Sequence, residues 1–115
     1  GGHDSVVMRC NYAVLLAETG HMDEGRTMLR GLLEVLELNG VTESLDCADI
    51  HLALAGVAGN AGDTEAAWEH GKKALSLYRL HLAAQPEAVM QHESEVGGIL
   101  RLAQRNERMK NRIHS

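Results

Sequence analysis

Residues 12–25 recur in pattern at residues 54–67, an offset of 42 positions. In both segments an apolar residue and an alanine precede a glycine, Gly20 or Gly62, and an acidic turn with a small residue follows it. Self-similarity at a fixed period of about 20–50 residues indicates an architecture in which copies of one supersecondary unit stack on one another. The repeat therefore predicts one domain built from stacked units.

Each unit has the pattern of two helices. Apolar residues fall at spacings of three and four, as in Val7, Cys10 and Val14, so that they share one helical face. Helix-ending signals stand at Gly20, Asn39-Gly40 and Gly62. The pattern predicts a hairpin over 5–38, a hairpin over 44–84 and a C-terminal helix over 87–112.

Composition supports an all-α fold. Only 3% of the 115 residues are aromatic, and Pro86 is the single proline, at a position that suits the first turn of a helix. The chain is instead rich in Leu, Ala, Met and Glu, which favour helices. We expect about five helices, arranged as antiparallel hairpins, with Thr42 or Ser44 capping the third helix and Asp63 or Thr64 the fourth.

This pattern resembles the tetratricopeptide repeat. The Leu-Gly pair of that family matches Tyr12-Ala13 and Leu54-Ala55, and its small residue near the start of the second helix matches Gly25 and Ala67. A third, partial unit fits Val96-Gly97. Because the offset of 42 exceeds the usual period of about 34, we expect longer second helices, as in the branch similar to kinesin light chain and LGN.

Small residues are expected where helices cross. A glycine inside a helix costs roughly 1 kcal/mol relative to alanine, so its presence needs a packing reason. We expect Gly25, Ala55, Ala67 and Gly97 to lie at such crossings. The strip of Ala53, Gly56 and either Gly59 or Asn60 either admits a partner backbone or serves packing within the domain.

The resemblance implies that the first helix of each hairpin lines a concave face. The residues expected on this face are Val7, Cys10, Asn11, Val14, Glu18, Asp49, Leu52, Ala53, Gly56, Asn60, Ser94, Gly98 and Arg101. Those chosen as partner-binding are Asn11, Val14, Glu18, Leu52, Gly56, Asn60, Arg101, Arg105 and Arg108.

Asn11 is the sharpest single candidate. In the kinesin-light-chain-like branch, an asparagine just before the Leu-Gly pair holds the backbone of an extended peptide, and a carboxamide both donates and accepts hydrogen bonds. The alternative is an ordinary solvated asparagine. The second unit has Ala53 at this position, so the residue is not repeated.

Charge is unevenly distributed along the chain. The net charge is −5, which argues against general nucleic-acid binding. From Arg101 onward there are five basic residues and one acid, and the first hundred residues carry six basic and fifteen acidic residues. Arg101, Arg105, Arg108 and Arg112 form one helical stripe, which either grips an acidic group or is a solvated face favoured by the helix dipole.

The sequence contains no catalytic or metal-binding motif that we recognise. Cys10 and Cys47 are widely separated and are expected to be reduced, buried thiols. The seven histidines form no HExxH motif or zinc finger, and are interpreted as exposed or capping residues. We therefore expect no cofactor, no metal and no enzymatic activity.

The sequence thus predicts a cytoplasmic scaffold or adaptor module that binds a peptide or helix of another protein, not nucleic acid or a membrane. The alternative is a self-associating, structural or regulatory segment of a larger protein. Because the chain begins Gly1-Gly2 and its first methionine is Met8, we expect a fragment of a longer protein.

Overall fold

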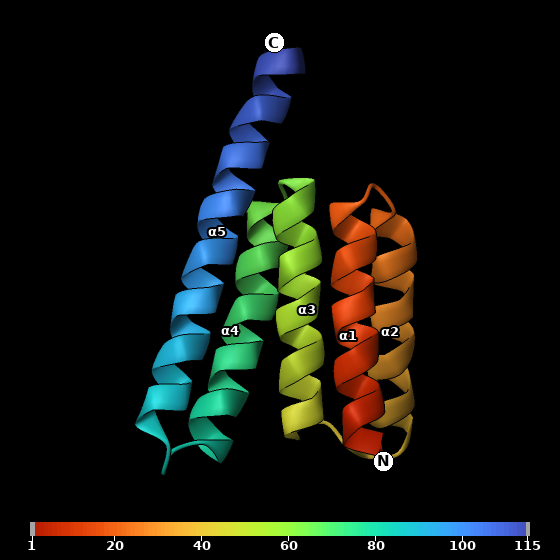
Figure 1. Cartoon of the computed structure of the whole chain (residues 1–115), viewed down its shortest axis with the longest axis vertical. Coiled ribbons are helices and arrows are strands. Elements are labelled where there is room, and N and C mark those ends of the chain that lie inside the picture. Colours follow the sequence, from red (N-terminus) through yellow and green to blue (C-terminus); the bar gives the residue numbers. More distant parts are fainter. Residues whose placement is uncertain (1, 115) are drawn as a thin grey trace.

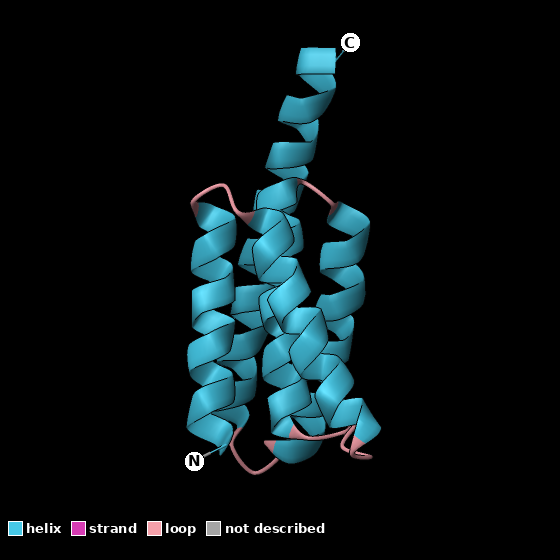
Figure 2. Ribbon diagram, turned by 90° about the vertical axis from the view of Figure 1, so that its right-hand side faces the viewer, coloured by secondary structure: helices cyan, strands magenta, loops and turns pink. Residues whose placement is uncertain are grey.

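A computed structural model describes the backbone of residues 2–114 and the side chains of residues 5–113; Gly1 and Ser115 lie outside these residues. The helices are α1 (Gly2–Glu18), α2 (Met22–Leu38), α3 (Leu45–Ala61), α4 (Thr64–His81) and α5 (Pro86–His114). Residues 2–114 contain no strand. The all-α fold of antiparallel hairpins predicted from the sequence is confirmed (Figures 1 and 2).

The helix ends follow from local chemistry. The Ser44 hydroxyl accepts a hydrogen bond from the Cys47 amide at 3.2 Å, and an Asp63 carboxylate oxygen accepts one from the Ala66 amide at 3.1 Å. Of the alternatives left open by the sequence, Ser44 and Asp63 are therefore the caps. Gly62 ends α3 with a φ of +72°, in the left-handed region that favours glycine.

The helices pack in a regular order. The two helices of each hairpin contact each other, α1 with α2 and α3 with α4, and both pack against the first helix of the next unit. Within the described part of the chain, neither α1 nor α2 contacts α4 or α5. The first helices α1, α3 and α5 therefore form one row, with α2 and α4 packed behind it (Figures 1 and 2).

Helix α3 is the centre of the molecule because it packs against all four other helices. Its sequence is apolar on most sides, which is typical of a largely buried helix. Ile50, Ala55 and Val57 are fully buried. One core cluster joins α3 to α1 and α2, and two smaller clusters join it to α4 and α5.

The small residues lie at crossings in the two hairpins but not in α5. A Cβ on Gly25 would stand 2.5 Å from the Ala13 carbonyl oxygen, and Ala55 and Ala67 are fully buried. The prediction for Gly97 is wrong, because a Cβ there would meet only the Arg101 side chain, at 3.6 Å. The α4–α5 crossing instead lies at Gly71, where a Cβ would stand 2.9 Å from Val96.

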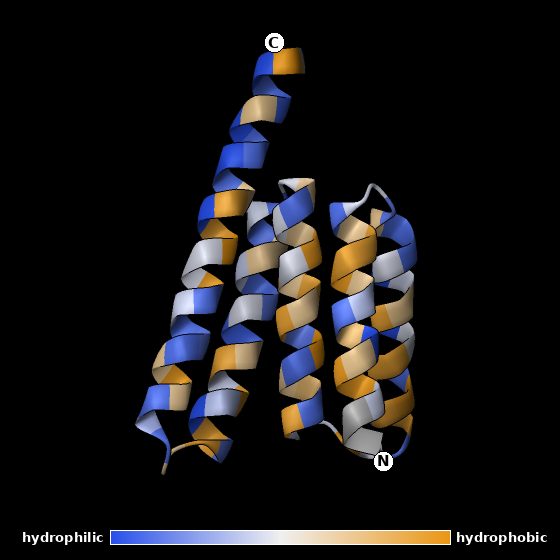
Figure 3. Cartoon of the chain, viewed as in Figure 1, coloured by the Kyte–Doolittle hydropathy of each residue, from blue (hydrophilic) through white to orange (hydrophobic). Residues whose placement is uncertain are grey.

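The second helices are about as long as the first helices. Helices α1, α2 and α3 each have 17 residues and α4 has 18, so the two helices of a hairpin differ by at most one residue. Helix α5 is longer, with 29 residues, and its C-terminal end projects beyond the others (Figure 1). This projecting end is mostly hydrophilic, although it carries Met109 and Ile113 (Figure 3).

Hydrogen bonds from α5 fix it to the end of α3. The Asn106 amide donates to the Gly59 carbonyl at 3.0 Å and to the Asn60 carbonyl at 3.3 Å. The Lys110 ammonium donates to the Ala61 carbonyl at 3.0 Å. These are carbonyls of the last turn of α3, where the helix dipole places partial negative charge.

Candidate functional site: a groove along the first helices

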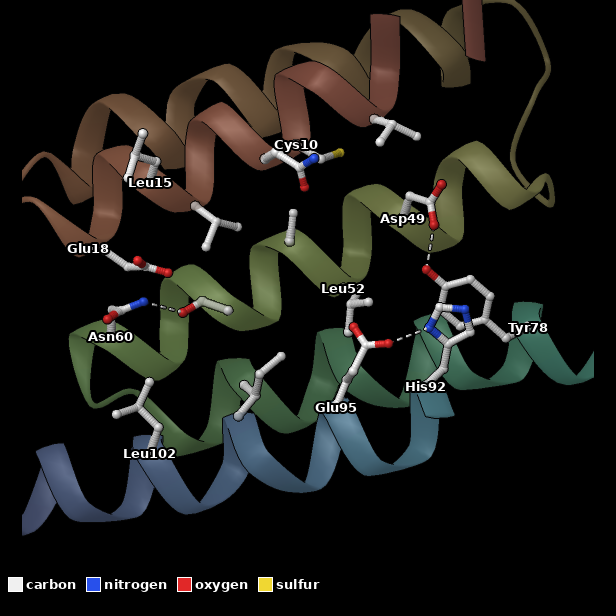
Figure 4. A pocket seen from close by; sticks show the side chains of 16 residues that line it. Cys10, Leu15, Glu18, Asp49, Leu52, Asn60, Tyr78, His92, Glu95 and Leu102 are labelled. Carbon is white, nitrogen blue, oxygen red and sulfur yellow. Dashed lines mark hydrogen bonds and ion pairs between the residues drawn. The ribbon is translucent and has the colours of Figure 1, made fainter. Parts of the chain in front are cut away.

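A groove of about 720 Å³ runs along the row of first helices. Helices α1 and α5 form its two walls, and α3 forms its floor (Figure 4). It is lined by Val7, Cys10, Asn11, Val14, Leu15, Glu18, Asp49, Leu52, Ala53, Gly56, Asn60, Tyr78, His92, Glu95, Ile99 and Leu102.

The expected positions on α1 and α3 all line this groove. Of the chosen binding residues, the groove brings together Asn11, Val14, Glu18, Leu52, Gly56 and Asn60. Val7, Cys10, Asp49 and Ala53, also expected on the concave face, join them.

The expected positions on α5 are wrong. Ser94, Gly98 and Arg101 do not line the groove; His92, Glu95, Ile99 and Leu102 do. The reason is the rotation of the helix: Val96 packs against Gly71 of α4, whereas Ile99 and Leu102 lie against Gly59 of α3. The repeat alignment at Val96-Gly97 had assigned a different face.

Asn11 and Asn60 differ in how far their amides are engaged. The Asn60 side chain donates to the Gly56 carbonyl of its own helix at 3.1 Å. The Asn11 side chain is exposed on the α1 wall and makes no hydrogen bond within the described residues. Asn11 therefore retains its full capacity to donate and accept.

A polar network occupies one end of the groove, where α3, α4 and α5 meet. The Tyr78 hydroxyl donates to Asp49 at 2.5 Å, and the Tyr78 ring stacks on His92 with centroids 3.7 Å apart. The His92 Nδ1 atom lies 3.1 Å from a Glu95 carboxylate oxygen. This contact lacks hydrogen-bond geometry, so the buried Nδ1 atom has no hydrogen-bond partner among the described residues.

Two groups that line the groove keep their protons at neutral pH. Burial raises the pKa of the Cys10 thiol to about 12, with further contributions from the charges of Asp49 and Asp46. Burial also raises the pKa of Tyr78, as does its hydrogen bond to Asp49. Because the thiolate is the nucleophilic form of cysteine, Cys10 is poorly suited to attack a substrate.

The arginine stripe lies on a different surface. Arg101, Arg105 and Arg108 border a separate depression of about 410 Å³ on α5, together with Gly98, Leu102 and Gln104. All three arginines are exposed, and Leu102 is the residue shared between this depression and the groove. The chosen binding residues therefore belong to two surfaces.

Tyr78, His92 and Glu95 are groove residues that the sequence analysis missed. His92, Glu95, Ile99, Leu102 and Asn106 follow one another at spacings of three and four, which is the signal of a single helical face. This signal was present in the sequence. Tyr78 had no such signal, because it enters the groove from a second helix.

The buried thiols were predicted correctly, but not every histidine. Cys10 and Cys47 are free and buried. His51 is buried instead of exposed, and its Nδ1 atom lies 3.1 Å from that of His70. Among the described residues, no group of three or more His, Cys, Asp or Glu residues is placed to hold a metal ion.

None of the described helices combines the length and apolarity needed to cross a membrane. Comparisons with protein-family models, with curated proteins and with solved structures find no match to this chain.

Proposed function

We propose that this chain is a protein–protein interaction module that holds a peptide or helix of another protein in the groove between α1, α3 and α5. The observation that carries the proposal is the groove itself. It is open, it runs along a single row of helices, and all of the expected binding positions of α1 and α3 line it.

The chemistry of the groove suits a protein ligand. Its floor and walls include Val14, Leu52, Ile99 and Leu102, which supply apolar surface for burying a partner's side chains. Asn11, exposed on one wall, offers a free carboxamide to a peptide backbone. Apolar surface with a few placed polar groups is the usual composition of a binding site.

The packing order supports a place for the chain among tetratricopeptide-like repeats. Each hairpin packs both of its helices on the first helix of the next unit, which is the arrangement a stacked-hairpin repeat requires. In this proposal the protein is a scaffold or adaptor without a cofactor or catalytic step, and its ligand is neither nucleic acid nor membrane. Its buried free thiols fit a reducing, cytoplasmic location.

A second candidate function is self-association as a regulatory or structural segment of a larger protein. The specific observation is the projecting end of α5, where Met109 is 52% and Ile113 is 76% exposed. Both follow Leu102 and Asn106 along one face of the helix. This face of α5 therefore continues beyond the helices that cover its N-terminal half.

A groove-filling pair of variants tests the first proposal. In Gly56→Leu the new side chain occupies the groove floor, whereas in Gly56→Ala the added Cβ makes only an ordinary contact with Val14 at 3.7 Å. Random peptides displayed on phage and selected on the wild-type protein should retain binding to Gly56→Ala and lose it on Gly56→Leu. Selected peptides that bind both variants equally would show that the groove is not the binding site.

A further inference from the structure

The groove has one sign of charge. Three carboxylates line it, those of Glu18, Asp49 and Glu95, and none of its described lining residues is Lys or Arg. The arginines of α5 border the separate depression. A groove with low-dielectric walls and charge of one sign concentrates the opposite charge.

The pKa values of neighbouring groups report the same field. The charges of Asp49 and Asp46 raise the pKa of the Cys10 thiol beyond the effect of burial, and those of Asp49 and Glu95 act likewise on Tyr78. Both groups would become anions on losing a proton, so both respond to negative potential. The field therefore reaches the groove interior from both the α3 and the α5 sides.

The carboxylates are separated by apolar surface. Glu18 lies near Asn60 at one end of the groove, whereas Asp49 lies beside Tyr78 and His92 at the other (Figure 4). Leu52 lies on the floor between these ends (Figure 4). Glu95 is 43% exposed and Glu18 is exposed, so both remain accessible to a ligand.

We propose that the occupant of the groove is an amphipathic segment of a partner protein, with apolar side chains at its centre and Lys or Arg toward both ends. This inference rests on the proposed function and names the chemical class of the ligand. The apolar side chains lie over Leu52, and the cations reach Glu18 at one end and Asp49 with Glu95 at the other. An acidic segment is repelled at both ends.

Long-range charge favours the same partner. The first hundred residues have a net charge of −9, from six basic and fifteen acidic residues. Complementary net charge accelerates encounter and suppresses partners of the wrong sign. The C-terminal end of α5 projects past the end of α3 (Figure 1).

Three matched probes test the inference by isothermal titration calorimetry on the full chain. The probes are 12-residue amphipathic peptides with leucine at identical central positions and Lys, Gln or Glu at the remaining positions. The Lys peptide should bind best and the Glu peptide worst, with a difference of at least about tenfold at low salt. The difference should shrink as salt screens exposed charges.

Matched variants locate the effect. The double variant Glu18→Gln/Glu95→Gln should weaken binding of the Lys peptide about fivefold, as expected for the loss of two exposed ion pairs. The control Glu34→Gln/Glu37→Gln changes net charge equally at exposed positions of α2 outside the groove, and should leave binding nearly unchanged.

The outcomes separate this inference from the proposed function. Equal binding of the Lys and Glu peptides, no binding of the Lys peptide, or equal effects of the two double variants would overturn the charge assignment. If the Gln peptide binds and Gly56→Leu abolishes that binding, while the Lys peptide shows no advantage, the groove function stands and the inference fails. Binding of the Lys peptide that survives Gly56→Leu would defeat both.

Discussion

The two walls of the groove differ in how well the sequence specifies them. On the α1 wall the expected residues Asn11, Val14 and Glu18 line the groove, as do those expected on the α3 floor. On the α5 wall none of the expected residues does so, because the helix is rotated toward His92 and Glu95. The alignment of the repeats therefore predicts which face of a helix lines the groove only where that helix also crosses a neighbour closely.

The crossings explain this difference. Helix α2 approaches α1 so closely at Gly25 that only a residue without a Cβ fits against the Ala13 carbonyl. Gly97, which corresponds to Ala13 in the third, partial unit, faces no such close neighbour. The rotation of α5 is set instead by Val96 against Gly71 and by Asn106 at the end of α3.

The largest expected effect compares the two glycines directly. Gly25→Ala places a methyl group 2.5 Å from the Ala13 carbonyl oxygen, so the helices must separate, at a cost of about 3 kcal/mol in free energy of unfolding. Gly97→Ala makes only an ordinary contact with the Arg101 side chain, at 3.6 Å, and should raise stability by up to about 1 kcal/mol, the helix-propensity difference. Urea denaturation of both variants measures this. If both variants changed in stability by the same amount, close crossings would not explain why the two walls of the groove differ in how well the sequence specifies them.

Replacement of buried alanines by leucine should have the next largest effect on stability. Ala67 of α4 and Ala103 of α5 are both fully buried in the cluster with Ala58. Ala67→Leu and Ala103→Leu should each cost about 2 kcal/mol through overpacking, whereas the exposed Gln104→Leu should change stability little. An unchanged melting temperature for Ala103→Leu would mean that the rotation of α5 is wrong.

A third prediction concerns the side of α3 that faces α4, away from both walls. Burial, His70 and Lys73 lower the pKa of His51 to about 4, and burial followed by Lys73 and Arg30 lowers that of His70. The unfolded chain takes up these protons near pH 6.5, before the folded chain does. Stability should therefore be full above pH 6.5 and fall as the pH drops from 6.5 to 4, by at most about 1.4 kcal/mol per pH unit for each proton.

Chemical denaturation across this pH range checks the prediction. His51→Gln removes one titrating group and should flatten the curve between pH 6.5 and 4. His21→Gln, at an exposed position, should retain the wild-type slope. If the stability of both variants falls with pH at the same rate, the acid sensitivity does not come from the contact between α3 and α4.

These outcomes follow the strength of the sequence signals. The fold class, the hairpins and the α1 and α3 sides of the groove were predictable, because Gly20, Gly62 and the apolar spacings act locally. The network of Tyr78, Asp49 and His92 was not, because it depends on where three different helices meet. The contact between His51 and His70 is equally non-local, and no spacing within one helix indicates it.

The smallest expected effect separates the two surfaces by their response to salt. Asn11→Ala removes an exposed neutral carboxamide and should weaken binding of a groove peptide by about 1 kcal/mol, nearly independently of salt. Arg105→Ala and Arg108→Ala should leave groove binding almost unchanged, because both arginines border the other depression. If the arginine variants abolish binding at low salt and Asn11→Ala does nothing, the partner docks on α5.

The central claim is that ligands bind in the groove between α1, α3 and α5, and amide chemical-shift mapping tests it most directly. Titration of isotopically labelled protein with the Lys peptide should shift the amides of residues 10–18, 49–60 and 92–99. The amides of the outer helix α2 should stay in place, as should those of residues 104–112 on α5. Shifts concentrated on residues 104–112, with the amides of α1 and α3 unmoved, would contradict the claim.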